Sequence, residues 1–432
     1  MSLEYVLVAF ALMVGMMLIG LPIAVSMAAI GIIGGVIAYG APFMNSISPV
    51  VWGVQNDSLL TSIPLFVLLG ELLLRAGIAD GMYRSLSVWL GRLPGGLLHS
   101  NIGTCALFAA TSGSSVATAA TVGTVALPSL NERHYPIRQS LGSLAAGGAL
   151  GILIPPSVNL IVYGSLTNTS IGQLFVAGVI PGILLTLLFM LYIGISSFFQ
   201  RDGNIEQVSY SWAERWRSSI DLLPPLVVFA IVMGSIYSGL ATATESAALG
   251  VVTAMAFASI KRKLQWEILR TCFIQTARVT GMIMLIITAA FILNLTISLT
   301  GVAGMMSSWV ISLGLTPVTF LMALVVFYLV LGMFMDVLSM QVATIPITYP
   351  MALALGIDPI WFGIFVVLMC ELGLITPPVG MNLFVVHGIR PDDGSISDVM
   401  YGALPYVGLI LLFSALLIMA PSLVMWLPEL MR

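Results

Sequence analysis

The chain has 432 residues, of which 59% are hydrophobic and 8% are charged, and its formal net charge is -3. This composition excludes an ordinary soluble domain and offers no basic patch for a nucleic-acid partner. Apolar runs of about 20 residues, long enough to cross a bilayer core about 30 Å thick, recur throughout. The sequence therefore predicts an all-α, multi-pass membrane protein surrounded by lipid.

The first apolar run, residues 3–20, begins without a preceding Lys or Arg and without a small-residue cleavage pattern. This start predicts a retained helix, not a removed signal peptide. Further helices are expected over residues 22–40 and 57–75. The three cysteines lie scattered in apolar sequence, so neither a metal site nor a disulfide framework is expected from Cys105, Cys272 and Cys370.

Residues 97–131 form an apolar stretch with a middle of small polar residues. We interpret it as a helical hairpin that enters the membrane and returns, with Ser112, Ser114 and Ser115 at its tip. The alternative is that these small residues only let membrane helices pack closely.

Residues 140–170 carry the double proline Pro155-Pro156. Proline lacks an N–H and clashes with the preceding turn, so this helix should break near mid-membrane. Free carbonyls at a break can hold a cation, and the N-terminus of a half-helix can face an anion. Asn159 follows the break and adds an amide. The alternative is a simple kink with an interhelical hydrogen bond.

After a helix over residues 171–200 and a cytoplasmic connector at 201–220, the second half contains a comparable series of elements. Its hairpin is expected at 316–350 and its broken helix at 358–387, with further helices at 221–238, 241–260, 272–298 and 401–427. The hairpin tip contains Asp336, Ser339 and Gln341. An acidic residue at membrane depth suggests ion or substrate binding, and helix capping is the alternative role for Asp336.

The two halves are related by a constant offset of 222 residues, which pairs Gly151 with Gly373 and Pro128 with Pro350. The chain is therefore predicted to be an internal duplication of residues 1–200 and 221–432. Each repeat holds about five crossings and a re-entrant hairpin, and an odd number of crossings turns the second repeat upside down. Inverted repeats are typical of transporters.

Every Lys and Arg except Arg432 falls on one side of these spans, which the positive-inside rule makes cytoplasmic. Residues 93–131, 139–200 and 279–335 contain no charged side chain. An anionic substrate would therefore have to be held by half-helix N-termini, hydroxyls, amides and cations bound with it. That arrangement predicts cation coupling, and sodium suits carbonyl and hydroxyl ligands.

Several segments together resemble the large membrane subunit of tripartite ATP-independent periplasmic transporters. They are GSSVATAATVG (113–123), GILIPPSVNLIVYG (151–164), ATATESAALG (241–250) and the run from Gly332 through ITPPVGMNLFV (375–385). The resemblance covers essentially the whole chain and implies a sodium-driven elevator in a bacterial inner membrane. It also implies a separate small four-helix membrane subunit and a periplasmic substrate-binding protein that captures a small organic anion, usually a carboxylate or sulfonate.

The resemblance also implies the site residues, with sodium ions as coupling ions and no other cofactor. One sodium site would lie between the first tip and the first break, formed by Ser112, Ser114, Ser115, Gly151, Ile154 and Asn159. The second would be formed by Gly332, Asp336, Gly373, Thr376, Val379 and Asn382. The substrate would lie between the tips, near Ser115, Asn159, Ser339 and Asn382.

Three other functions fit parts of the pattern. A standalone divalent-anion sodium symporter would share the architecture without needing a binding protein. An intramembrane serine protease could use Ser114 or Ser115 with His387 as base, although the duplication argues against an enzyme. A passive channel would not accumulate solute against its gradient.

Overall fold

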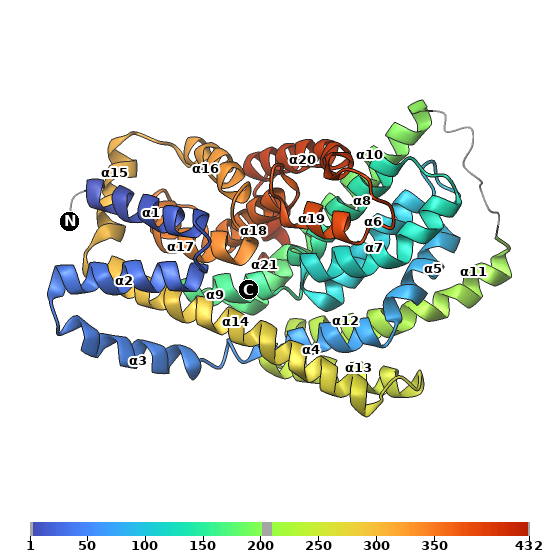
Figure 1. Cartoon of the computed structure of the whole chain (residues 1–432), viewed down its shortest axis with the longest axis horizontal. Helices are drawn as coiled ribbons and strands as arrows, with labels where there is room; N and C mark the ends of the chain where they lie inside the picture. Colours follow the sequence, from blue (N-terminus) through green and yellow to red (C-terminus); the bar gives the residue numbers. More distant parts are fainter. Residues whose placement is uncertain (1–2, 201–209, 431–432) are drawn as a thin grey trace.

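The computed structural model describes residues 3–200 and 210–430, and within those ranges every regular element is a helix (Figure 1). The predicted connector at 201–220 is therefore described from residue 210 onward, and Arg432 lies outside the described residues. In the first half the helices are α1 (Leu3–Leu18), α2 (Ile23–Tyr39), α3 (Phe43–Gln55), α4 (Ser62–Arg75), α5 (Ile78–Leu90), α6 (Leu97–Ser112), α7 (Ser115–Glu132), α8 (Ile137–Ala149), the 3-10 turn η1 (Leu150–Ile152), α9 (Val158–Thr167) and α10 (Ile171–Gln200).

The second half contains a matching series. Its helices are α11 (Trp212–Ser218), the 3-10 turn η2 (Ser219–Leu222), α12 (Leu223–Tyr237), α13 (Ala243–Ile260), α14 (Trp266–Leu299), α15 (Val302–Ser312), α16 (Pro317–Gly332), α17 (Val337–Ala354), α18 (Pro359–Ile375), α19 (Met381–Gly388), α20 (Ile396–Met419) and α21 (Ser422–Glu429).

Local backbone features recur at equivalent points of the two halves. Gly77 precedes α5 with φ of 67°, and Gly301 precedes α15 with φ of 70°, a left-handed conformation that glycine adopts without a Cβ penalty. Both double prolines contain a cis peptide bond. The predicted fold class is confirmed: an all-α membrane protein of two inverted repeats, each with a hairpin and a broken helix.

Each hairpin packs on the broken helix of its own repeat. Helices α6 and α7, the first hairpin, pack on α8, and α16 and α17, the second hairpin, pack on α18. We call residues 112–115 the first tip and 333–336 the second tip. The first break, residues 150–157, separates α8 from α9, and the second break, residues 376–380, separates α18 from α19.

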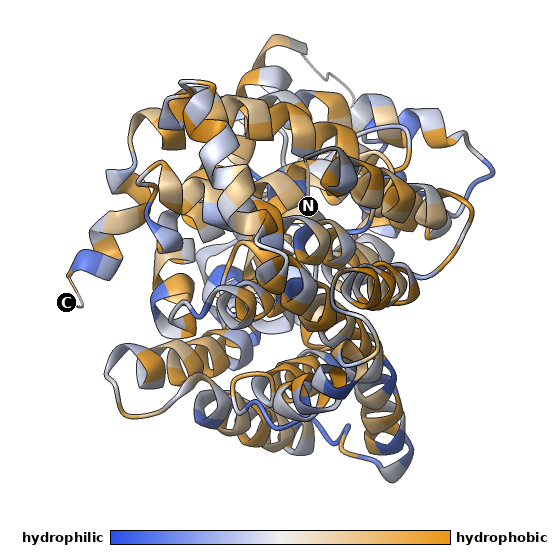
Figure 2. Ribbon diagram, turned by 90° about the vertical axis from the view of Figure 1, so that its left-hand side faces the viewer, coloured by the Kyte–Doolittle hydropathy of each residue, from blue (hydrophilic) through white to orange (hydrophobic). Residues whose placement is uncertain are grey.

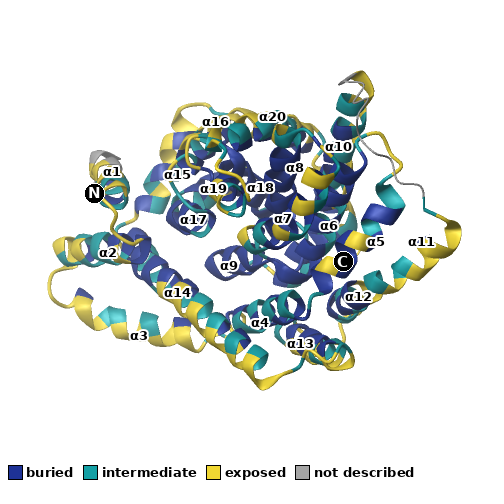
Figure 3. Ribbon diagram, turned by 45° about the vertical axis from the view of Figure 1, so that its right-hand side comes forward, coloured by how far each residue is buried: buried dark blue, intermediate teal, exposed yellow. Residues whose placement is uncertain are grey.

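The hairpins and broken helices form the buried centre of the molecule. Figure 3 shows α8 and α18 mostly in dark blue, and every residue of α18 from Ile360 onward is buried. In Figure 1, α2, α14 and α13 run along the opposite side from α16 and α20, where α2 packs on α14 and α13 packs on α4 and α12. The outer helices remain largely hydrophobic (Figure 2), as lipid contact requires.

Four helices fall outside the predicted spans, namely α3, α5, α11 and α15, and the single helix predicted at 401–427 is two helices, α20 and α21. Helices α4 and α5 bend by 66° and α15 and α16 by 116°, so each pair breaks up what looks like one apolar run. By length and composition, six of the described helices can cross a membrane, or up to eight if each bent pair is one span. Ten crossings were predicted, and the difference arises because helices such as α2 and α18 have 17 residues.

An ion-pair cluster joins the repeats at the predicted cytoplasmic side. Arg138 at the start of α8 pairs with Asp398 of α20 at 3.1 Å, and Asp398 also accepts from Arg390 at 3.2 Å. The side chain of Arg390 is 4% exposed and also donates to Asp392 at 2.8 Å. This hydrogen bond is the main cause that holds the pKa of Asp392 below its ordinary value.

We expect Asp398→Asn to lower the unfolding midpoint in detergent, because Arg390 and Arg138 both lose a charged acceptor. A hydrogen bond to a charged group contributes about 1.5–3 kcal/mol. The control is Asp393→Asn, since Asp393 is exposed and in no ion pair of the described residues. The pKa of Asp392 is lowered in the folded state, so the ion pair of Asp392 with Arg390 stabilises the fold at a pH above the unfolded pKa. This stabilisation is lost as the pH falls through the folded pKa. Equal midpoints for the two variants would contradict the structural role of the cluster.

Candidate functional site

The first tip lies directly against the first break. Gly113 closes α6 with φ of 61°, and a Cβ there would come 2.7 Å from the carbonyl oxygen of Pro156. On the other side, a Cβ at Gly151 would come 2.7 Å from Cα of Ser115 and 2.8 Å from the carbonyl oxygen of Ser114. Since glycine alone permits these approaches, the sequence brings two irregular backbone segments together inside the membrane.

The hydroxyls of the first tip mostly serve local bonds. Ser114 caps α7, and its carbonyl oxygen accepts from the Thr118 hydroxyl at 2.7 Å. The Ser112 and Thr118 hydroxyls are 3.0 Å apart, and the Ser115 hydroxyl donates weakly to the carbonyl of Ala149 at 3.4 Å. The three predicted serines therefore lie together, and of their hydroxyls that of Ser115 reaches the end of α8, next to the break.

The second tip repeats this arrangement on the second broken helix. Gly332 and Gly373 meet backbone to backbone, since a Cβ on Gly373 would come 2.8 Å from Cα of Gly332. Asp336 caps α17 by accepting from the backbone N–H of Ser339 at 3.2 Å, and the Ser339 hydroxyl also donates to its carboxylate. Asp336 therefore has the helix-capping role that was predicted from the sequence as the alternative. Its carboxylate also lies at the second tip.

The second break presents a cluster of carbonyl oxygens. A Cβ at Gly380 would come 2.9 Å from the carbonyl oxygen of Leu374 and 3.0 Å from that of Thr376. The Thr376 hydroxyl donates to Leu372 at 2.6 Å. Because oxygens converge here around a residue without a side chain, the donor set fits a hard cation such as sodium better than a transition metal. In the described ranges no group of three His, Cys, Asp or Glu could hold a metal.

Two hydrogen bonds join the two repeats close to the breaks. The side-chain amide of Gln341, in the second hairpin, donates to the carbonyl of Asn159 at 2.9 Å. The amide of Asn382, after the second break, donates to the carbonyl of Ala145 in α8 at 3.2 Å. Each repeat therefore supplies a hydrogen-bonding group close to the break of the other repeat.

Several buried polar atoms near the breaks have no hydrogen-bond partner among the described residues. They are Asn159 Nδ2, Gln341 Oε1, Asn382 Oδ1 and both carboxylate oxygens of Glu371. Buried polar atoms are nearly always paired, so unpaired ones at two neighbouring breaks indicate capacity for a ligand or ion.

Two predicted residues lie less centrally. Ile154 is half-buried and contacts α10 at Gly182, and Val379 is 41% exposed, so any contribution from either would come from the backbone carbonyl. The protease alternative finds no support in hydrogen bonding, because within the described residues the hydroxyls of Ser114 and Ser115 bond to backbone and not to His387. Sequence reasoning missed Gly113 and Gly380, whose left-handed backbone is visible only once the breaks are placed.

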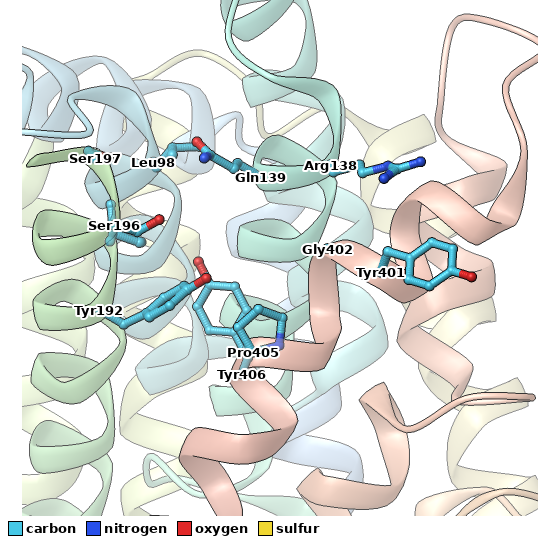
Figure 4. A pocket seen from close by; sticks show the side chains of 11 residues that line it. Leu98, Arg138, Gln139, Tyr192, Ser196, Ser197, Tyr401, Gly402, Pro405 and Tyr406 are labelled. Atoms are coloured by element: carbon cyan, nitrogen blue, oxygen red, sulfur yellow. The ribbon is translucent and has the colours of Figure 1, made fainter. Parts of the chain in front are cut away.

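A cavity of about 130 Å³ lies away from both tips (Figure 4). It opens between α10 and α20 beside the ion-pair cluster, and Arg138, Tyr192 and Tyr406 are among its lining side chains. Tyr192 and Tyr406 stack edge to face at 5.3 Å. The tips and breaks remain the candidate functional site, since irregular backbone and unpaired buried polar atoms meet there.

Residues 10–423 match the family described as "Tripartite ATP-independent periplasmic transporter, DctM component". The C4-dicarboxylate TRAP transporter large permease protein DctM of Vibrio cholerae is 32% identical over 98% of this chain and 97% of its own length. The sialic acid TRAP transporter large permease protein SiaM of the same species is 30% identical over 96% of each chain.

Two solved structures share the fold at low identity. The YdaH transporter of Alcanivorax borkumensis has a TM-score of 0.57 and 16% identity, covering 86% of this chain and 89% of its own. MtrF of Neisseria gonorrhoeae has a TM-score of 0.60 and 12% identity, covering 89% and 83%. Both likenesses concern the arrangement of helices.

Proposed function

Because this chain belongs to the DctM component family of tripartite ATP-independent periplasmic transporters, as a multi-pass large permease of the inner membrane, we propose that it carries out sodium-coupled uptake of a small organic anion. The family works with a small membrane subunit and a periplasmic binding protein. In our proposal the binding protein delivers a carboxylate or sulfonate to this chain. Relatives named for C4-dicarboxylates, sialic acid and isethionate support that substrate class.

The observation that carries the proposal is the meeting of each hairpin tip with a broken helix. Carbonyls, hydroxyls and amides converge there. No Lys or Arg occurs at residues 93–132, 139–200 or 279–389, which contain both hairpins and, apart from the first turn of α8, both broken helices. An anion placed between the tips would therefore depend on bound sodium for its charge balance. Two such meetings suggest at least two sodium ions per cycle.

We further propose an elevator movement. The transport domain would consist of the two hairpins and the two broken helices, and the scaffold of α1, α2, α4 and α12–α14. Support comes from the burial of α8, α9 and α18 and from the packing of α2 and α4 on α14 and of α13 on α4 and α12, which is more extensive than the contacts of these helices with the hairpins.

Uptake of labelled carboxylates and sulfonates into proteoliposomes tests the proposal. The vesicles contain this chain with its small subunit, and the sodium gradient and the binding protein are each added or withheld. We expect uptake to require both. Uptake that needs sodium alone would indicate a standalone symporter, and uptake that never exceeds equilibrium would indicate a channel.

We expect Asn159→Ala and Asn382→Ala each to raise the half-saturating sodium concentration by about three- to tenfold, the range set by the loss of one hydrogen bond. Both amides are buried at a break, so their loss should weaken ion binding while the chain still inserts. Sodium titration of uptake measures the effect, and Asn294→Ala in the scaffold helix α14 is the control. Unchanged sodium dependence in both variants would remove the two asparagines from the site.

A further inference from the structure

Glu371 is a fully buried carboxyl in α18 that the proposed sodium and substrate sites do not use. It is 0% exposed, and it takes part in none of the ion pairs among the described residues. Neither of its carboxylate oxygens has a hydrogen bond of normal length and angle. An acidic side chain at membrane depth without a partner is expensive to bury, and this favours a functional reason for its presence.

Helix α18, which carries Glu371, packs on η1 of the first break. The Glu371 carboxyl lies near the backbone N–H of Leu153, the residue that follows η1 in the first break. That N–H has only a long bond of 3.3 Å to the carbonyl of Leu150. The side chain of one broken helix thus offers an acceptor to the irregular backbone of the other.

These contacts form one continuous path between the two tips. Ser115 of the first tip touches Gly151, two residues before Leu153. Glu371 lies two residues before Gly373, which touches Gly332 next to the second tip. Apart from Glu371, each step in this path is a contact between backbones or a short run of chain, so the carboxyl is the link that a mutation can remove.

We propose that Glu371 is a positioning residue that couples the two sodium sites, by supporting the first break from the second broken helix. This inference rests on the proposed function. Sodium bound at one break would order that break and the tip beside it. Through Glu371 it would also order the backbone of the other break. The two sites then bind sodium cooperatively, because ordering one lowers the cost of ordering the other.

The test titrates sodium chloride, balanced with choline chloride, against the unfolding midpoint of this chain with its small subunit in detergent. In the wild type we expect the midpoint to rise with sodium with a Hill coefficient above 1. Glu371→Leu, which fills the space without an acceptor, should raise the half-saturating sodium concentration about tenfold and bring the Hill coefficient toward 1. Glu371→Gln keeps the acceptor and should stay within about twofold of the wild type.

A purely structural role would lower the midpoint equally at all sodium concentrations, so the shape of the titration separates the two roles. Glu267→Leu, at an exposed glutamate of α14, is the control. A Leu variant that titrates like the wild type, or a Gln variant that fails like the Leu variant, would overturn the inference. If Glu371→Leu does not fold, Glu371→Asp replaces it, since the shorter side chain withdraws the same acceptor and should also raise the half-saturating concentration.

Failure of the proposed function gives a different result. In that case the wild type itself shows no sodium effect on its midpoint, and the coupling falls with it. A wild type that responds to sodium while the Leu variant keeps full cooperativity contradicts the role of Glu371 alone.

Discussion

Gly332→Ala is expected to reduce sodium-dependent uptake by roughly five- to hundredfold. The added methyl would overlap Cα of Gly373, at the point where the second hairpin meets the second broken helix. Neither partner can move aside as a flexible side chain would, because both contact atoms belong to backbone. Overpacking at such a contact costs about 1–3 kcal/mol, and that cost falls on the conformation in which tip and break form the site.

Gly408→Ala in α20 is the matched control for this variant. Gly408 also lies within a helix, but it is exposed, and a Cβ there would meet nothing within 4 Å. The control should transport like the wild type, with an equal or slightly higher unfolding midpoint because alanine favours the helix. If Gly332→Ala transports at the control's rate, the close approach at this point is not needed for the site.

The second large effect is expected for Asp336→Asn, which separates the charge of this residue from its capping role. Asparagine caps a helix as well as aspartate does, so α17 should keep its bond from the Ser339 N–H. The negative charge at the second tip is lost. We expect the half-saturating sodium concentration for uptake to rise about tenfold or more, as for the loss of a charged ligand.

Two further variants separate the effect of the lost charge from the effect of a changed helix cap. Asp358→Asn changes an equivalent cap at the start of α18, which accepts from Ile360 and Trp361 at 2.8 and 3.1 Å. It should leave the sodium dependence unchanged. Asp336→Ala should add a loss of about 1 kcal/mol of stability to the sodium defect. Wild-type sodium dependence in Asp336→Asn would show that capping is the whole role of this carboxylate.

The repeat carried most of what could be predicted about the fold. The spacing between Gly151 and Gly373 located both broken helices, and the small polar residues located the two tips. Helix α3 was missed because its sequence, with Asn45 and the internal Pro49, is too polar and interrupted for a crossing. Helix α15 was missed because hydropathy reports how apolar a segment is and not where it bends.

The candidate site was predictable at the level of segments but not of partners. The double prolines and the residues after them showed that Asn159 and Asn382 follow the breaks. The residue types could not show that the Asn382 amide donates to the carbonyl of Ala145 or that the Gln341 amide donates to the carbonyl of Asn159. These contacts depend on how the repeats pack together. For the same reason the residue types could not show that Glu371 of the second broken helix lies near Leu153 of the first.

The exchange of contacts between the repeats bears on how such a protein could have arisen. Neither half contains a complete set of hydrogen bonds around its own break, because Gln341 serves the first and Ala145 serves the second. A shorter ancestor encoding a single repeat would have needed a second copy of itself inserted in the opposite orientation to build the same centre. A single chain that contains both repeats fixes them in a one-to-one ratio, so each repeat can depend on contacts that the other supplies.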